Sequence, residues 1–140
     1  MIVLSTDVVY EAMKPAPDAA VVAWLNDQAA ETLYITAVTL GELLFDIQAL
    51  PQDMRRDELG GALNDMLELF RDRVLPFDAD AARHYAQLAA SSKLSGQRFL
   101  MPNGYIAAIA ASRGFVVVAR DAAVYEQVGV SAITPWLRST

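Results

Sequence analysis

Short apolar runs alternate with longer segments of helical periodicity along this chain. Each apolar run is bounded by polar, glycine or proline positions, which is typical of buried strands. Between the runs, apolar residues recur every three to four positions, as in amphipathic helices. The pattern predicts strands at residues 1–5, 32–35, 74–77, 115–119 and 130–133. It predicts helices at about residues 7–13, 17–28, 40–50, 51–70, 79–93 and 103–112, and a short one around Val124 and Tyr125.

The predicted strands are separated by helices, with no hairpin signal between them. This order indicates a parallel sheet with crossover helices. We therefore expect one α/β domain over residues 1–140, with a central parallel sheet of about four to five strands flanked by helices. The glycine pair at residues 60–61 weakens its helix and suggests a bend or a close helix contact there.

The composition limits the cellular setting. Hydrophobic residues make up 54% of the chain and charged residues 20%, which suffices for a packed core. No apolar run approaches the ~20 residues that span a bilayer, and the N-terminus lacks the features of a signal peptide. The chain has no cysteine, which excludes disulfides and thiolate metal sites. We expect a soluble cytoplasmic protein without a membrane partner.

The formal net charge of −6 argues against tight, unassisted RNA binding, because proteins that bind phosphates usually present a basic face. The arginines between residues 55 and 73 are interleaved with acids, which favours a solvated helix face. An acidic balance is still compatible with a metal-dependent nuclease, since such sites are clusters of carboxylates.

Several acids follow predicted strands or begin predicted helices. A parallel sheet brings its strand ends to one edge, so these acids are expected to converge there. Grouped carboxylates favour Mg²⁺ or Mn²⁺, and such ions can support phosphodiester hydrolysis. The alternative is that each acid caps a helix. For Asp78 we expect the cap, and for Asp121 a cap or a metal ligand. The acids are Asp7, Glu42, Asp78 and Asp121.

Segments at residues 2–11, 33–43, 73–78, 106–110 and 135–136 share an order and spacing that resemble a known family. The chain resembles PIN-domain ribonucleases of the VapC/FitB-like type, the toxins of bacterial type II toxin–antitoxin pairs. The resemblance implies a PIN-like fold, Mg²⁺-dependent endoribonuclease activity on RNA and a homodimer. It also implies a VapB/FitA-like antitoxin whose C-terminal segment lies in a groove beside the active site. Helices 40–50, with Phe45, and 59–70 can line such a groove, although their leucines also suit a core.

The metal site departs from the family pattern. The four acids of the family fall on Ser5, Glu42, Asn103 and Val124, and only Glu42 remains an acid. Neutral oxygens are poorer Mg²⁺ ligands than carboxylates. The remaining acids near these positions are Asp7 and Asp121.

A rearranged site of Asp7, Glu42 and Asp121 can hold one Mg²⁺ or Mn²⁺. In an extended segment the side chains of Ser5 and Asp7 point the same way. However, a shift of two residues moves a carboxylate by several ångströms, whereas a metal–ligand bond tolerates about 0.2 Å. We therefore expect metal binding to be weak or absent, and the site to be weak or inactive.

Three further residues have open or structural roles. Thr6 either bonds to nearby groups through its hydroxyl or contacts a substrate phosphate. Arg120 either contacts a phosphate or neutralises Glu42. His84 is expected to be structural, so no histidine-based triad is available.

Two functions of different class remain. The first is a Mg²⁺-dependent endoribonuclease toxin with a rearranged site. The second is a catalytically dead PIN-like binding or regulatory protein that pairs with an antitoxin or RNA. A flavodoxin-like ligand-binding protein is disfavoured, because no glycine-rich phosphate loop follows the first strand.

Overall fold

A computed structural model describes residues 1–94 and 102–136. The strands form one sheet of five, in the order β3-β2-β1-β4-β5, and every neighbouring pair is parallel. The expected parallel α/β sheet is therefore confirmed. The strands are β1 (Ile2–Leu4), β2 (Leu33–Thr36), β3 (Val74–Leu75), β4 (Val116–Val118) and β5 (Ala132–Ile133).

Helices connect the strands as the periodicity predicts, but several begin at other residues. The second helix begins only after Asp18, whose carboxylate accepts the amide protons of Ala20 and Val21. The helices predicted at 40–50 and 51–70 begin at Ala37 and Met54. The loop expected at residues 95–97 lies outside the described residues. The helices are α1 (Thr6–Met13), α2 (Ala19–Asn26), α3 (Ala37–Gln48), α4 (Met54–Leu69), α5 (Ala79–Leu94), α6 (Asn103–Arg113) and α7 (Ala122–Glu126), with a 3-10 turn at Ala30–Thr32.

The glycine pair in α4 does not mark a close helix contact. No atom lies within 4 Å of the position that a Cβ would take at Gly60 or Gly61. A close approach was thus the wrong explanation, and Met54–Leu69 continues through both glycines.

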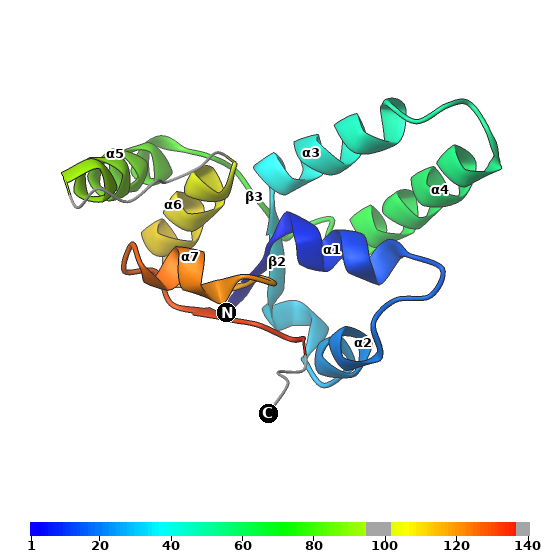
Figure 1. Cartoon of the computed structure of the whole chain (residues 1–140), viewed down its shortest axis with the longest axis horizontal. Coiled ribbons are helices and arrows are strands. Elements are labelled where there is room, and N and C mark those ends of the chain that lie inside the picture. The colour runs from blue at the N-terminus through cyan, green and yellow to red at the C-terminus, as the bar shows by residue number, and fades with distance from the viewer. Residues whose placement is uncertain (95–101, 137–140) are drawn as a thin grey trace.

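The two faces of the sheet carry separate cores. Successive strand residues point to opposite faces, so Val3 joins the core beneath α5–α7 and Leu4 the core beneath α1–α4. Figure 1 shows these two groups of helices on either side of the sheet. Within residues 1–94 and 102–136, no helix combines the length and hydrophobicity needed to cross a membrane.

The strand order reverses between β1 and β4. The chain moves outward from β1 to β3 on one side, then returns to place β4 and β5 on the other. In open α/β sheets, such a switch point leaves a crevice outside the carboxyl ends of the two strands. The segments after β1 and β4 are therefore the elements that the fold presents to a ligand.

Candidate functional site

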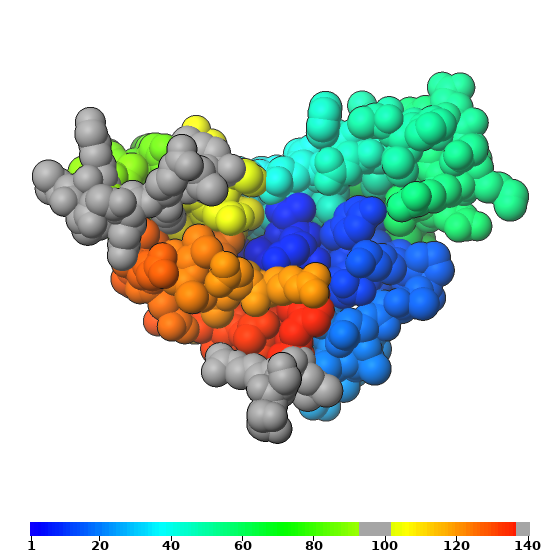
Figure 2. Space-filling model, in the orientation of Figure 1, coloured from blue at the N-terminus to red at the C-terminus, as the bar shows by residue number. Residues whose placement is uncertain are grey.

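A cavity of about 450 Å³ opens at this switch point, a volume in the range of small-ligand sites. In Figure 2 the start of α1, in dark blue, is recessed between α3 in cyan and the yellow and orange segments that carry α6 and α7. The sequence-predicted residues that line the cavity are Thr6, Asp7, Glu42, Asn103, Arg120 and Asp121.

Asp7 is held by three protein donors. Its Oδ1 accepts the hydroxyl of Ser5 and the amide of Val8 (2.9 Å), and its Oδ2 accepts the amide of Arg120 (3.0 Å). The expectation that Ser5 and Asp7 share an extended segment is wrong, because α1 begins at Thr6. They meet because Ser5 occupies the N-cap position of that helix. Asp7 thereby fastens the end of β4 to the start of α1.

Ser5, the first of the replaced acid positions, stands behind the cavity. Its side chain is buried, with 2% exposure, and it does not line the cavity wall. Its hydroxyl instead supports Asp7.

Glu42 has a different environment. The hydroxyl of Thr6 donates to Glu42 Oε1 (2.5 Å), and Thr6 Oγ1 also contacts Thr39 Oγ1 (3.1 Å). Burial raises the pKa of the Glu42 carboxyl, the hydrogen bond from Thr6 partly offsets this, and the charges of Asp46 and Asp7 raise the pKa further. A cation bound beside Glu42 would relieve this accumulation of negative charge.

The placement of Glu42 follows from the start of α3. Thr36 is the N-cap, and its Oγ1 accepts the amide of Thr39 (3.0 Å). The first turns of α3 then carry Glu42 to the carboxyl edge of the sheet.

Asp121 and Asn103 complete the polar lining. Asp121 stands at the N-cap position of α7, but its side chain makes no capping hydrogen bond, so the cap interpretation is wrong. Its carboxylate belongs to the cavity wall. Asn103 is the first residue of α6 and contributes a neutral amide.

Tyr125 also lines the cavity, although the residue is itself buried. Its exposure is 2%, and its pKa is raised well above the ordinary value, first by burial and then by the charges of Asp7, Glu42 and Asp121. The phenol therefore stays neutral across the physiological range. Val124, the fourth replaced acid position, packs against the core beneath α5–α7 instead of lining the cavity.

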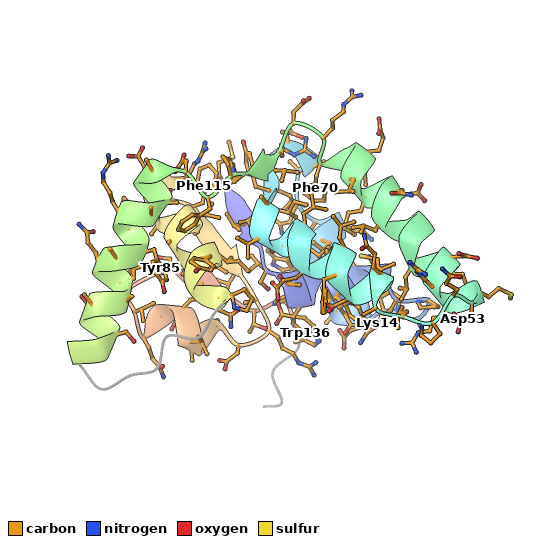
Figure 3. All side chains as sticks on the ribbon, turned by 90° about the horizontal axis from the view of Figure 1, so that it is seen from above. Lys14, Asp53, Phe70, Tyr85, Phe115 and Trp136 are labelled. Carbon is orange, nitrogen blue, oxygen red and sulfur yellow. The ribbon has the colours of Figure 1, made fainter. Side chains whose placement is uncertain are left out.

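Two cation–aromatic pairs line the same cavity. The guanidinium of Arg120 lies 5.1 Å from the centre of the Trp136 ring, and the ammonium of Lys14 lies 5.8 Å from that of Tyr10. Figure 3 shows Lys14 and Trp136 at the same edge of the molecule. Among residues 1–94 and 102–136, no salt bridge joins Arg120 to a carboxylate, so of its two suggested roles the pairing with Glu42 is wrong.

Two other candidates lie outside the cavity. Asp78 caps α5, with its Oδ1 accepting the amide of Ala81 (2.9 Å), as expected. His84 lies on the same helix, where its Nδ1 is 2.9 Å from the carbonyl oxygen of Asp80.

Helical spacing would have revealed several lining residues that the sequence analysis omitted. Tyr10 and Glu11 lie three and four positions after Asp7 on α1, and Lys14 is the C-cap residue of that helix. Asp46 lies four positions after Glu42 on α3. Such spacings place side chains on one helix face. Trp136 has no comparable signal, because it reaches the cavity only through the path of the chain after β5.

The carboxylates do not form a compact metal-binding group. Within the described ranges, 1–94 and 102–136, no three His, Cys, Asp or Glu side chains lie close enough together to bind one metal ion. Protein donors occupy three of the roughly four lone-pair positions of the Asp7 carboxylate. The lining residues whose oxygens could hold a divalent cation are therefore chiefly Glu42, Asp121 and Asn103.

Comparison with known proteins agrees with this geometry. A family model described as the PIN domain matches residues 2–130. VapC ribonuclease Y4jK of Sinorhizobium fredii is 45% identical over 137 residues, covering 97% of this chain and 98% of the relative. Toxin FitB of Neisseria gonorrhoeae is 35% identical over 137 residues, covering 97% and 99%. A solved structure of FitAB bound to the IR36 DNA fragment superposes with a TM-score of 0.92 at 33% identity, covering 100% and 99%.

Proposed function

Since this chain belongs to the PIN-domain family, among the relatives of VapC and FitB, we propose that it is the toxin of a toxin–antitoxin pair and a weak, metal-dependent endoribonuclease. The observation that carries the proposal is the convergence of Asp7, Glu42 and Asp121 on one cavity at the switch point of the sheet. The identity to a relative named as a VapC ribonuclease supports RNA as the substrate.

The proposed metal is a single Mg²⁺ or Mn²⁺. Glu42 and Asp121 would supply its charged ligands and Asn103 a neutral one. When bound, such an ion neutralises phosphate charge and lowers the pKa of its water. Thr6 orients Glu42 through its hydroxyl, and Arg120 supplies a positive charge for a phosphate.

The proposed partner is an antitoxin of the VapB/FitA kind. The toxin itself would form a homodimer. The relative FitAB is a solved complex of this type of system. An apolar surface on α3 and at the start of α4 supports a docking groove, because Leu44, Phe45 and Met54 are 39%, 70% and 73% exposed. The cytoplasmic location stays a prediction.

A second function is favoured by the state of Asp7. Its carboxylate already serves three protein donors, which is the arrangement of a structural residue. On this view the chain is a catalytically dead PIN-like protein that binds an antitoxin or RNA.

Cleavage of a panel of structured RNAs decides between these functions. The intact protein is assayed with Mg²⁺, with Mn²⁺ and with EDTA, beside Glu42→Ala and the matched control Glu68→Ala. Glu68 is exposed and lies outside the cavity, in a surface pair with Arg71. We expect metal-dependent cutting that Glu42→Ala abolishes and Glu68→Ala preserves. Absence of cutting, or cutting that survives both Glu42→Ala and EDTA, would instead establish the catalytically dead protein.

A further inference from the structure

The cavity has two chemically distinct parts. One part is the carboxylate group of Asp7, Glu42 and Asp121, and the other is formed by aromatic rings in contact with cations. The proposed cleavage uses the first part. It gives no role to the indole of Trp136, which lines the same cavity.

We propose that Trp136, together with Arg120, forms a stacking subsite for an unpaired nucleobase of the RNA. This inference rests on the proposed function, because it assigns the substrate of the same cavity to single-stranded RNA. Proteins that bind single strands combine aromatic rings, on which bases stack, with cations that contact the backbone. Trp136 and Arg120 supply one of each, in contact with each other.

The position of Arg120 joins the two parts. Its backbone amide is held by Asp7 (3.0 Å), while its exposed guanidinium lies over the indole. A nucleotide is complementary to this pair, because ribose joins its flat base to a negatively charged phosphate. A base stacked on Trp136 would therefore bring its phosphate near Arg120, beside the carboxylates.

Trp136 is held in place before any ligand arrives. Its backbone amide donates to Thr134 Oγ1 (3.4 Å), and its ring packs partly against the core beneath α1–α4. The residue remains half-buried, so part of its surface is accessible. A ring that is already ordered loses little conformational freedom when a base stacks on it.

The second cation–aromatic pair gives the strand a path. Tyr10 and Lys14 also line an adjacent hollow of about 820 Å³ that extends to Arg55. Neighbouring nucleotides can thus follow α1 away from the carboxylates. Bases within a duplex are stacked on each other, so this arrangement suits an unpaired strand.

The cavity is acidic, because five carboxylates line it beside the cations of Arg120 and Lys14, and Lys14 is paired with Glu11 (3.2 Å). An RNA phosphate therefore approaches with a divalent cation bound at the carboxylates, and the flat ring beside Arg120 is what favours a nucleotide over a peptide. An antitoxin segment on Trp136 is nevertheless the alternative occupant, and the experiment includes it.

Fluorescence tests the subsite directly, because the chain has two tryptophans. In the variant Trp24→Phe, Trp136 is the remaining tryptophan. The added substitution Glu42→Gln prevents cutting during the measurement. The full chain is titrated in Mg²⁺ with a short fluorescein-labelled oligouridylate, with a hairpin RNA of fully paired stem, and with the antitoxin. Anisotropy reports binding, and an unlabelled oligouridylate is used to follow quenching of Trp136.

We expect the oligouridylate to quench Trp136 saturably and the paired stem to leave its emission unchanged. In the Glu42→Gln background, Trp136→Ala should weaken oligouridylate binding by about five- to a hundredfold, the usual range for loss of one base–aromatic stack. Trp136→Phe should restore most of the affinity. The control Leu69→Ala, which removes an exposed apolar side chain outside the cavity, should not change it. Circular dichroism verifies that each variant is folded.

The proposal is overturned if folded Trp136→Ala binds the oligouridylate as tightly as its parent, or if saturating RNA leaves Trp136 emission unchanged. If Trp136→Ala weakens binding of the antitoxin but not of the oligouridylate, the ring serves the protein partner, and this result also overturns the proposal. Binding is measured without turnover, so the two proposals can fail separately. If RNA stacks on Trp136 but the unsubstituted protein cleaves no RNA, the ribonuclease activity is refuted and the subsite stands. If the protein cleaves RNA but no base stacks on Trp136, the subsite is refuted and the ribonuclease activity stands.

Discussion

Asp7 and Glu42 line one cavity but occupy opposite physical environments. Around Asp7, the ends of β1 and β4 aim three donors at the carboxylate. Around Glu42 there is one hydroxyl donor, from Thr6 on α1, together with partial burial and the carboxylates of Asp46 and Asp7, and the pKa of Glu42 is raised. The first environment stabilises a negative charge, whereas the second penalises it. A residue that destabilises the protein in its charged form is a stronger candidate for function than one that holds the fold together.

The largest expected effect on stability comes from removing the carboxylate of Asp7, which accepts three hydrogen bonds. Asp7→Ala removes the acceptor for Ser5, Val8 and Arg120, and we expect it to lower the free energy of unfolding by about 1–3 kcal/mol. Asp7→Asn keeps one acceptor oxygen and should cost less. Urea unfolding followed by circular dichroism measures both. Equal stability of Asp7→Ala and the parent would mean that these hydrogen bonds are not formed in solution.

A smaller loss is expected from Thr6→Val, which keeps the shape of the side chain and removes the donor to Glu42. The loss should be about 1 kcal/mol, the usual net contribution of one hydrogen bond. Because the Thr6 hydroxyl opposes the rise in the Glu42 pKa, the variant should raise that pKa further. Carboxyl-carbon NMR of Glu42 follows the titration, and an unchanged or lowered pKa would contradict the role given to Thr6.

Glu42→Gln should change stability slightly and in the opposite direction. The folded state binds the Glu42 proton more tightly than the unfolded state does, so the ionised side chain destabilises the fold. This penalty is absent below the ordinary pKa of glutamate and grows as the pH rises through the folded value. Glu42→Gln should therefore be slightly more stable than the parent at neutral pH and equal to it in acid. Thermal unfolding over a pH series checks the sign, and a variant less stable at neutral pH would refute it.

The smallest effect is expected from Tyr125→Phe. Its phenol is neutral at physiological pH, so the substitution should alter the free energy of unfolding by less than about 1 kcal/mol. In an alkaline titration followed by tyrosine absorbance, the step at the highest pH should be absent from this variant. If the latest-titrating tyrosine persists, the carboxylates do not act on Tyr125 as described.

The sheet and the meeting of the acids were predictable from the chain alone. Short apolar runs such as residues 115–119 have no stable place outside a sheet interior, and helices between them imply parallel strands. The carboxyl edge of such a sheet then gathers Asp7, Glu42 and Asp121. These steps need only periodicity and topology.

The partners of each side chain were not predictable in the same way. A hydrogen bond depends on distances of a few tenths of an ångström, and Asp7 meets the amide of Arg120 across 113 positions of sequence. Asp121 likewise stands where a capping residue is expected, yet makes no cap bond. These individual hydrogen bonds decide whether a carboxylate stabilises the fold or remains available to a ligand.

The bond from Arg120 to Asp7 also has a consequence for biosynthesis. β1 is the first strand made, but its neighbour β4 is synthesised only after β2, β3 and six helices. The cavity therefore has no wall at Arg120 and Asp121 until the ribosome has released that late segment, and contacts of such long sequence separation form slowly. A chain that ends before β4 therefore lacks Arg120, Asp121 and Tyr125 and cannot form the complete cavity.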